Sequence, residues 1–122
     1  MIDTPVIIEP SRGGDLDHFA ALARAYQGRR LIVKGLCGSA CTVFLGNPNL
    51  CAGPRARFVF HASTLVAWDG HVIGPDPEGT ARLYAYYPTK VRAFVNANGG
   101  LTTRPITLMG DELRAIVPEC KP

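Results

Sequence analysis

The chain alternates between short apolar runs, typical of buried strands, and longer segments whose apolar positions recur every three or four residues, typical of helices. The runs predict strands at residues 5–9, 30–34, 57–62 and 106–108, and a short edge-like piece at 50–52. The periodic segments predict helices at residues 16–27, 40–45, 77–87, 89–98 and 111–116.

Local signals support the helix ends. Asp15 is placed to cap the first helix and Gly28 to stop it. Ser39 is placed to cap the second helix, and Pro88 fits the first turn of the helix that follows it. Residues 68–77, rich in glycine and proline, predict a loop.

Strands that alternate with helices predict an α/β fold, a parallel sheet with helical layers. Two glycine-rich turns, residues 10–14 and 35–38, follow the first two strands. In a parallel sheet such turns lie together at the carboxyl ends of the strands, where sites form. No internal repeat or linker divides the chain, so residues 1–122 are expected to form a single domain.

Composition narrows the functional classes. The 122 residues are 47% hydrophobic and 19% charged, which excludes a disordered chain. A net charge of +3, dispersed along the chain, argues against nucleic-acid binding. No apolar stretch is long enough to span a bilayer. Neither a dinucleotide-binding glycine motif nor a P-loop is present, so we expect no cofactor.

The four cysteines carry information about the compartment. They form no CxxC pair, and the three histidines lie at no ligand spacing to them, so we expect no metal site. An even number allows three disulfide pairings and favours a periplasmic or secreted protein, whereas four buried thiols would suit the cytosol. The first residues lack the features of a signal peptide, so this localisation rests on the cysteines.

One serine and one histidine are candidates for catalysis. Ser39 lies in GLCGSAC at a predicted helix N-terminus, where the dipole and free amides favour developing negative charge. His61 follows 22 residues later, at the end of the next substantial strand. The alternatives are a plain helix cap for Ser39 and a core histidine for His61. His18 and His71 are expected on a helix surface and in a loop.

Three motifs occur in order: SRGGDL, then GLCGSACTVFLG, then PRARFVFHA. Together with the final stretch from Tyr87 to Ile116, they resemble the Clp protease proteolytic subunit branch of the crotonase-like superfamily. The resemblance is greatest to its small extracytoplasmic bacterial members, which carry a Cys-x-Ser-Ala-Cys turn. It covers nearly the whole chain from Pro5 onwards.

The resemblance implies a crotonase-like domain with a mainly parallel twisted sheet and surrounding helices. The domain would be truncated at the N-terminus, because the family's usual first strand and hairpin are missing. It implies a serine hydrolase or peptidase that acts on a peptide or acyl substrate. Ser39 matches the nucleophile and His61 the general base, and the backbone amides of Gly14 (or Gly13) and Ala40 match the oxyanion hole.

Two positions depart from the family pattern. Arg12 replaces the proline of the first turn, either facing substrate or solvated. The catalytic acid is expected within residues 98–107, which contain no carboxylate. Three aspartates elsewhere do not match that position: Asp69, Asp76 and Asp111.

The missing acid leaves two hypotheses open. One is a Ser-His dyad helped by Asn98 or Thr102, and the other is a catalytically inactive binding or assembly module. A thiol-redox role for Cys37 and Cys41 is disfavoured, because their spacing differs from the usual dithiol motif.

Four aromatic residues lie in the second half of the chain: Trp68, Tyr84, Tyr86 and Tyr87. They could form a peptide groove or an oligomer contact, or they could pack in the core along the long helix. In the resembled family this helix mediates assembly, so a homo-oligomer is expected. Three cations are assigned to a solvated helix face rather than an anion site: Arg82, Lys90 and Arg92.

Within the resemblance, Cys37 and Cys41 flank the candidate nucleophile, Cys51 lies on the strand before His61, and Cys120 lies near the C-terminus. We therefore predict a Cys37–Cys41 disulfide that braces the Ser39 turn. We predict a second, Cys51–Cys120, that ties the tail to the sheet.

Overall fold

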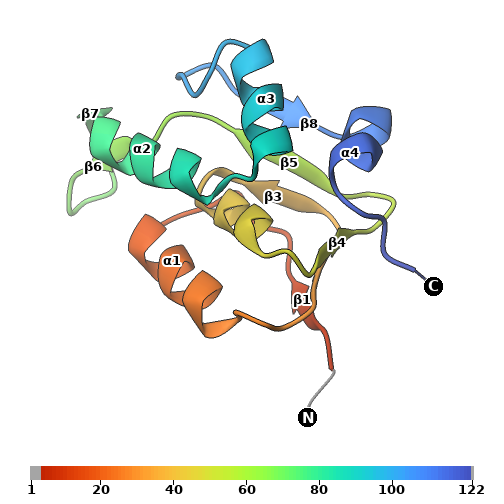
Figure 1. Cartoon of the computed structure of the whole chain (residues 1–122). Helices are drawn as coiled ribbons and strands as arrows, with labels where there is room; N and C mark the ends of the chain where they lie inside the picture. The colour runs from red at the N-terminus through yellow and green to blue at the C-terminus, as the bar shows by residue number, and fades with distance from the viewer. Residues whose placement is uncertain (1–3, 122) are drawn as a thin grey trace.

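Three short parallel strands form the first sheet of the computed structural model, which describes residues 4–121 (Figure 1). Strand β1 (Val6–Ile8) pairs with β2 (Leu31–Val33), and β2 pairs with β4 (Leu50–Ala52). Parallel neighbours need a crossover connection. Helix α1 (Leu16–Ala25) provides it between β1 and β2, and the Asp15 carboxylate caps this helix as predicted.

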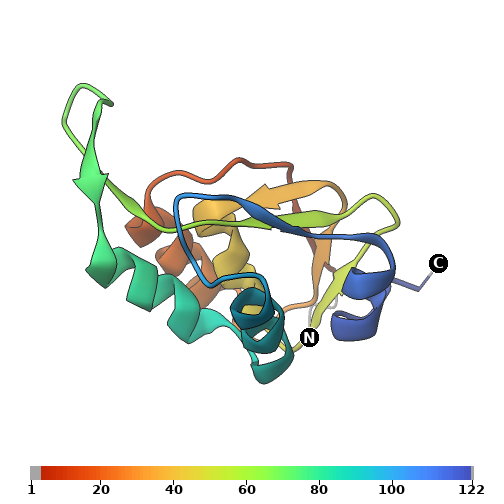
Figure 2. The same cartoon turned by 90° about the horizontal axis from the view of Figure 1, so that it is seen from above.

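A second sheet begins only three residues after β2 ends. Strand β3 (Leu36–Gly38) pairs in parallel with β5 (Arg57–Phe60), and β5 pairs antiparallel with β8 (Ile106–Leu108). A third, separate sheet is a two-stranded antiparallel hairpin of β6 (Thr64–Val66) and β7 (Val72–Pro75). Figure 2 shows this hairpin projecting from the body of the molecule beyond the helices.

The prediction of one mainly parallel, twisted, crotonase-like sheet is therefore wrong. The described chain has small sheets of three, three and two strands, and the pairings of β8 and of the hairpin are antiparallel. One reason is that residues 35–38, expected to be only a turn, turn sharply at Gly35 and then continue as β3 in a new sheet. The α/β character of the chain is confirmed.

The hairpin also corrects the loop predicted at residues 68–77, since this segment contains β7. A strand is recognisable in a sequence when one of its faces is buried, because apolar and polar residues then alternate. All three residues of β6 are exposed, and so are three of the four residues of β7. These strands therefore lack the alternation that marks a half-buried strand.

The remaining helices lie near their predicted positions. They are a 3₁₀ helix η1 (Ser39–Gly46), α2 (Pro77–Tyr86), α3 (Thr89–Ala97) and α4 (Gly110–Ile116). Six of the eight residues of η1 are buried, so it lies at the centre of the fold, and α1 and α2 both contact it (Figure 1). Within residues 4–121, no helix combines the length and apolar character needed to cross a bilayer.

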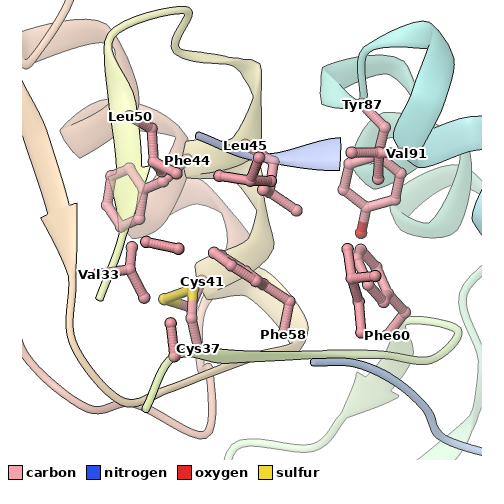
Figure 3. Packing of buried hydrophobic residues seen from close by; sticks show 14 of the residues in the cluster. Val33, Cys37, Cys41, Phe44, Leu45, Leu50, Phe58, Phe60, Tyr87 and Val91 are labelled. Atoms are coloured by element: carbon pink, nitrogen blue, oxygen red, sulfur yellow. A yellow bond between two sulfur atoms is a disulfide. The ribbon is translucent and has the colours of Figure 1, made fainter. Parts of the chain in front are cut away.

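The main hydrophobic core packs between η1 and the second sheet. Figure 3 shows Leu45 of η1 above Phe58 of β5, and Phe60 of β5 near Val91 of α3. Phe44 of η1 lies on the other side, beside Val33 and Leu50 of the first sheet. Phe58 and Phe60 have no exposed surface. Burial of large side chains of this kind stabilises a fold by about 1.5–3 kcal/mol each. Since β5 leads into His61 and η1 begins at Ser39, the core also fixes the two candidate catalytic segments.

Two disulfides cross-link the chain, in the pairing predicted from the sequence. Cys37 is bonded to Cys41, with a Cα–Cα distance of 5.2 Å, and Cys51 to Cys120, at 4.9 Å. The second disulfide lies beside backbone pairing of the tail with β4, in which the Ala52 N–H donates to Pro118 and the Cys120 N–H donates to Ala52. The tail thereby covers an otherwise open sheet edge.

We expect the double variant Cys51→Ser/Cys120→Ser to lower the free energy of unfolding by about 4 kcal/mol, because the disulfide closes a long loop and so restricts the unfolded chain. Urea denaturation without reductant, followed by circular dichroism, measures this change. The wild-type protein unfolded after complete reduction serves as a control. A loss below about 1 kcal/mol would show that the β4–tail pairing holds without the disulfide.

Candidate functional site

Ser39 lies at the junction of β3 and η1, and its backbone is unusual. Its φ of 53° makes it the single non-glycine residue with positive φ in the described chain. Such residues are uncommon and cluster at functional sites, where the surrounding structure holds them. The N-cap of η1 is Gly38, and no side chain caps this helix. The interpretation of Ser39 as a plain helix cap is therefore wrong.

Two interactions hold the Ser39 turn from inside the protein. The Cys37–Cys41 disulfide brackets it, and both cysteines are fully buried. The Thr42 hydroxyl donates a hydrogen bond of 2.6 Å to the Ser39 carbonyl. The backbone of Ser39 is thus fixed on both sides while its residue surface stays partly accessible.

The first glycine-rich turn packs directly against this serine. The Ser11 N–H donates to Leu36 and the Gly38 N–H donates to Ser11, both at 2.8 Å, so the turn is bound to β3. Gly13 has a φ of 102°, and a Cβ atom added there would lie 2.6 Å from the Ser39 Cβ and 2.8 Å from the Gly38 carbonyl oxygen. Only glycine permits this approach.

Two of the residues predicted for an oxyanion hole, Gly14 and Ala40, line the same groove as Ser39. The first N–H groups of a helix have no partner within it, which applies to Ala40. The Gly13 N–H, by contrast, is already donated to the Ser11 hydroxyl at 3.0 Å. Of the two glycines predicted for an oxyanion hole, Gly14 is therefore the one whose amide can serve a ligand.

The groove around Ser39 has a volume of about 890 Å³. One wall is the start of α1 at residues 15–17, and the other is the hairpin at residues 64–68. An ion pair between Arg82 and Asp17, at 2.8 Å, joins α2 to α1 beside the groove. The Arg82 guanidinium donates this hydrogen bond to the Asp17 carboxylate, which raises the pKa of Arg82. Arg82 is exposed, as predicted for a solvated helix face, and it also pairs with Asp17.

His61 follows β5 directly and is half-buried. Its Nδ1 atom lies 2.8 Å from the Ala62 carbonyl oxygen. Because a carbonyl oxygen only accepts, Nδ1 is the donor, which leaves Nε2 of the neutral ring free to accept a proton. This is the tautomer that a general base needs.

The two catalytic candidates lie at the same end of paired strands. Strand β3 pairs with β5 so that Gly38 is opposite Val59, and Ser39 and His61 follow the carboxyl ends of these parallel strands. No hydrogen bond joins their side chains in residues 4–121, and His61 does not line the groove. Catalytic hydrogen bonds are often long before a substrate binds.

The carboxylates that did not match the family pattern have other partners. Asp76 caps α2 by accepting from the Gly79 N–H and from the Ser63 hydroxyl, each at 3.0 Å. Asp69 accepts from the His71 N–H in the hairpin turn, and Asp111 pairs with Arg114. No carboxylate is hydrogen-bonded to His61 within the described chain.

The segment expected to carry the acid does lie beside His61. The Thr102 carbonyl accepts from the Ala62 N–H at 2.7 Å. The Thr102 hydroxyl accepts from the Arg104 N–H, and the Asn98 side-chain amide donates to the Phe94 carbonyl. Both candidate helpers are thus engaged within their own segment, and the histidine partner is Ala62, which sequence reasoning missed.

The aromatic and cationic residues divide between core and surface. Tyr87 is buried, whereas Trp68 at the hairpin is 99% exposed. Arg92 lies over the Tyr84 ring, at 5.0 Å from its centroid, and Lys90 is exposed.

Thr42 was also missed, although its position as the one polar residue in the apolar run ACTVFL was a usable signal.

No family model matches this chain, and no curated protein matches it. The family resemblance therefore rests on the sequence motifs.

Across residues 4–121, no group of three or more histidine, cysteine or acidic side chains is arranged to hold a metal ion.

We expect Gly13→Ala to lower the free energy of unfolding by about 3 kcal/mol, because the added methyl group overlaps the Ser39 turn. The matched control is Gly28→Ala, at a positive φ with open space around it, which should cost about 1 kcal/mol. Urea denaturation of both variants gives the comparison. Equal losses would show that the close contact with Ser39 is not constraining.

Proposed function

We propose that the protein is a serine hydrolase that attacks the carbonyl carbon of a peptide or acyl substrate with the Ser39 hydroxyl. The observation that carries the proposal is the positive φ of Ser39 at a strand-to-helix turn that lines a groove. A sharp turn of this kind exposes a serine nucleophile beside the free amides of the helix that follows. The motif resemblance to Clp protease proteolytic subunits supports the same assignment.

The residues take the following roles in the proposed reaction. The Ser39 oxygen bonds to the carbonyl carbon while Nε2 of His61 takes the hydroxyl proton. The N–H groups of Gly14 and Ala40 donate to the oxyanion that forms, which in enzymes of this kind is worth about 3 kcal/mol per donor. The protonated His61 then gives its proton to the leaving group, and water releases the acyl group from Ser39 by the reverse sequence of proton transfers.

The histidine works here without a carboxylate partner. The Ala62 carbonyl fixes the tautomer of His61 by accepting from Nδ1. A neutral carbonyl orients the ring but stabilises the imidazolium less than a carboxylate does. Loss of the acid costs about 10⁴-fold in a well-studied triad, and most of that loss comes from the wrong tautomer. We therefore propose a slow hydrolase whose ring tautomer is nevertheless correct.

A second function is supported by the hairpin. It carries most of the exposed large apolar residues of the described chain: Leu65, Val66, Trp68, Val72 and Ile73. An exposed apolar patch marks a binding surface. The alternative is thus a non-catalytic binding or assembly module, with a homo-oligomer as one form. The two disulfides support a periplasmic or secreted location in either case.

We expect a fluorophosphonate probe to form a covalent adduct with the wild-type protein, because an activated serine attacks its phosphorus. Ser39→Ala should abolish the adduct. Ser63→Ala is the matched control and should keep it, because the Ser63 hydroxyl is already donated to Asp76. Mass spectrometry of the tryptic peptides identifies the modified residue. Absence of any adduct, or an adduct that persists in Ser39→Ala, would favour the binding module.

We expect His61→Ala to slow probe labelling by at least ~100-fold, because the general base is lost. His71→Ala, which removes an exposed histidine of the hairpin, should label at the wild-type rate. The rate is followed by gel fluorescence over time. Equal rates in the two variants would remove His61 from the mechanism while leaving Ser39 as the nucleophile.

A further inference from the structure

Three hydroxyl and carbonyl groups form a chain beneath the candidate nucleophile. Thr42 is the one polar or charged residue among the fully buried side chains of the described chain. Its Oγ1 lies 2.6 Å from the Ser39 carbonyl oxygen and 2.6 Å from the Tyr87 hydroxyl oxygen. Tyr87 is 45 residues away in sequence, so this contact connects distant segments.

The direction of both hydrogen bonds follows from the number of protons. The Ser39 carbonyl only accepts, so Thr42 must donate its single hydroxyl proton to it. The Thr42 oxygen then has only lone pairs left for Tyr87, and Tyr87 must be the donor. Burial raises the pKa of Tyr87 to about 12, so this phenol stays protonated at neutral pH. The chain therefore runs from Tyr87 through Thr42 to Ser39, and each donor polarises the next.

Tyr87 also contacts the strand that leads to the candidate base. Its ring packs edge-on against Phe60, with 5.2 Å between the centroids and an angle of 88° between the ring planes. Both side chains are labelled in Figure 3. Phe60 is the last residue of β5 and immediately precedes His61. The Tyr87 side chain, which is 2% exposed, thus contacts both Thr42, which is bonded to Ser39, and Phe60, which precedes His61.

We propose that Tyr87, acting through Thr42, is a positioning residue that holds the Ser39 turn in its left-handed conformation and in fixed relation to the strand bearing His61. The threonine alone could bond back to the carbonyl three residues earlier, as threonines in helices often do. The hydrogen bond from Tyr87 connects this Thr42–Ser39 bond of η1 to the residue that follows α2. The inference rests on the proposed function only where it concerns catalysis, because the control of the Ser39 backbone is independent of it.

The test uses the full chain and four substitutions. Thr42→Val removes the hydroxyl at nearly constant volume, and Tyr87→Phe removes only the phenolic oxygen. Thr42→Ser keeps the hydroxyl and serves as the conservative rescue. Tyr84→Phe is the matched tyrosine control, because the Tyr84 hydroxyl bonds to exposed Asn96 and not to the Ser39 turn.

Two measurements are made on each variant. The three-bond HN–Hα coupling of Ser39, from nuclear magnetic resonance, reports its φ whether or not the protein is an enzyme. The labelling rate with the fluorophosphonate probe reports nucleophile placement. We expect Thr42→Val and Tyr87→Phe to shift the coupling and to slow labelling by ~10–100-fold. Thr42→Ser and Tyr84→Phe should stay near wild type in both.

The outcomes separate the two proposals. An unchanged Ser39 coupling in folded Tyr87→Phe would overturn the positioning role, whatever the labelling shows. A shifted coupling in a protein whose wild-type form takes no label would uphold the positioning role and overturn the hydrolase. If Thr42→Val does not fold, Tyr87→Phe decides the question, because it removes only the phenolic oxygen and leaves the ring in place.

Discussion

The left-handed backbone of Ser39 is the constraint on which the other features of this fold depend. It lets the chain pass from β3 directly into η1, whose residues fill the centre of the molecule between α1, α2 and the second sheet. A residue with positive φ persists only when its surroundings hold it. Here a disulfide, the glycine turn and a buried hydroxyl chain act together on one residue, and their combined effect is a serine presented at the edge of a groove.

The chemistry proposed for the site depends on backbone groups as much as on side chains. Gly14 and Ala40 line the groove, and the carbonyl of Ala62 accepts from His61 Nδ1, the hydrogen bond that a carboxylate would accept in a full triad. Such groups are invisible to a search for catalytic residue types, because every residue carries them. The proposed mechanism therefore uses a backbone carbonyl, and not a carboxylate of residues 98–107, as the partner of His61 Nδ1.

Much of the local structure could be predicted, because helices and strands that bury one face against the core place their apolar residues in recognisable patterns. The helices of the second half show periodic apolar positions, the buried strands are short apolar runs, and Asp15 is a local capping signal. Ser39 and His61 could be named as candidates because one lies in a glycine-rich turn at a predicted helix N-terminus and the other at the end of the next substantial strand. The sheet architecture was not, because a turn at Gly35 sends β3 into another sheet, and the hairpin strands are exposed and so show no alternation. Tyr87 was missed as a partner because its role depends on a contact between distant elements, and Ala62 was missed because every residue carries a backbone carbonyl.

The sequence by itself determined which segments are helical, which residue types stand at the glycine turns, and which four cysteines were available to cross-link. These properties follow from local preferences and from periodic burial along one segment. Only the tertiary structure decided that Gly13 lies against Ser39, that Gly14 and not Gly13 has a free amide, and that Tyr87 reaches Thr42. Each of these depends on atoms from distant segments meeting within a few ångströms, which no local pattern of residues encodes.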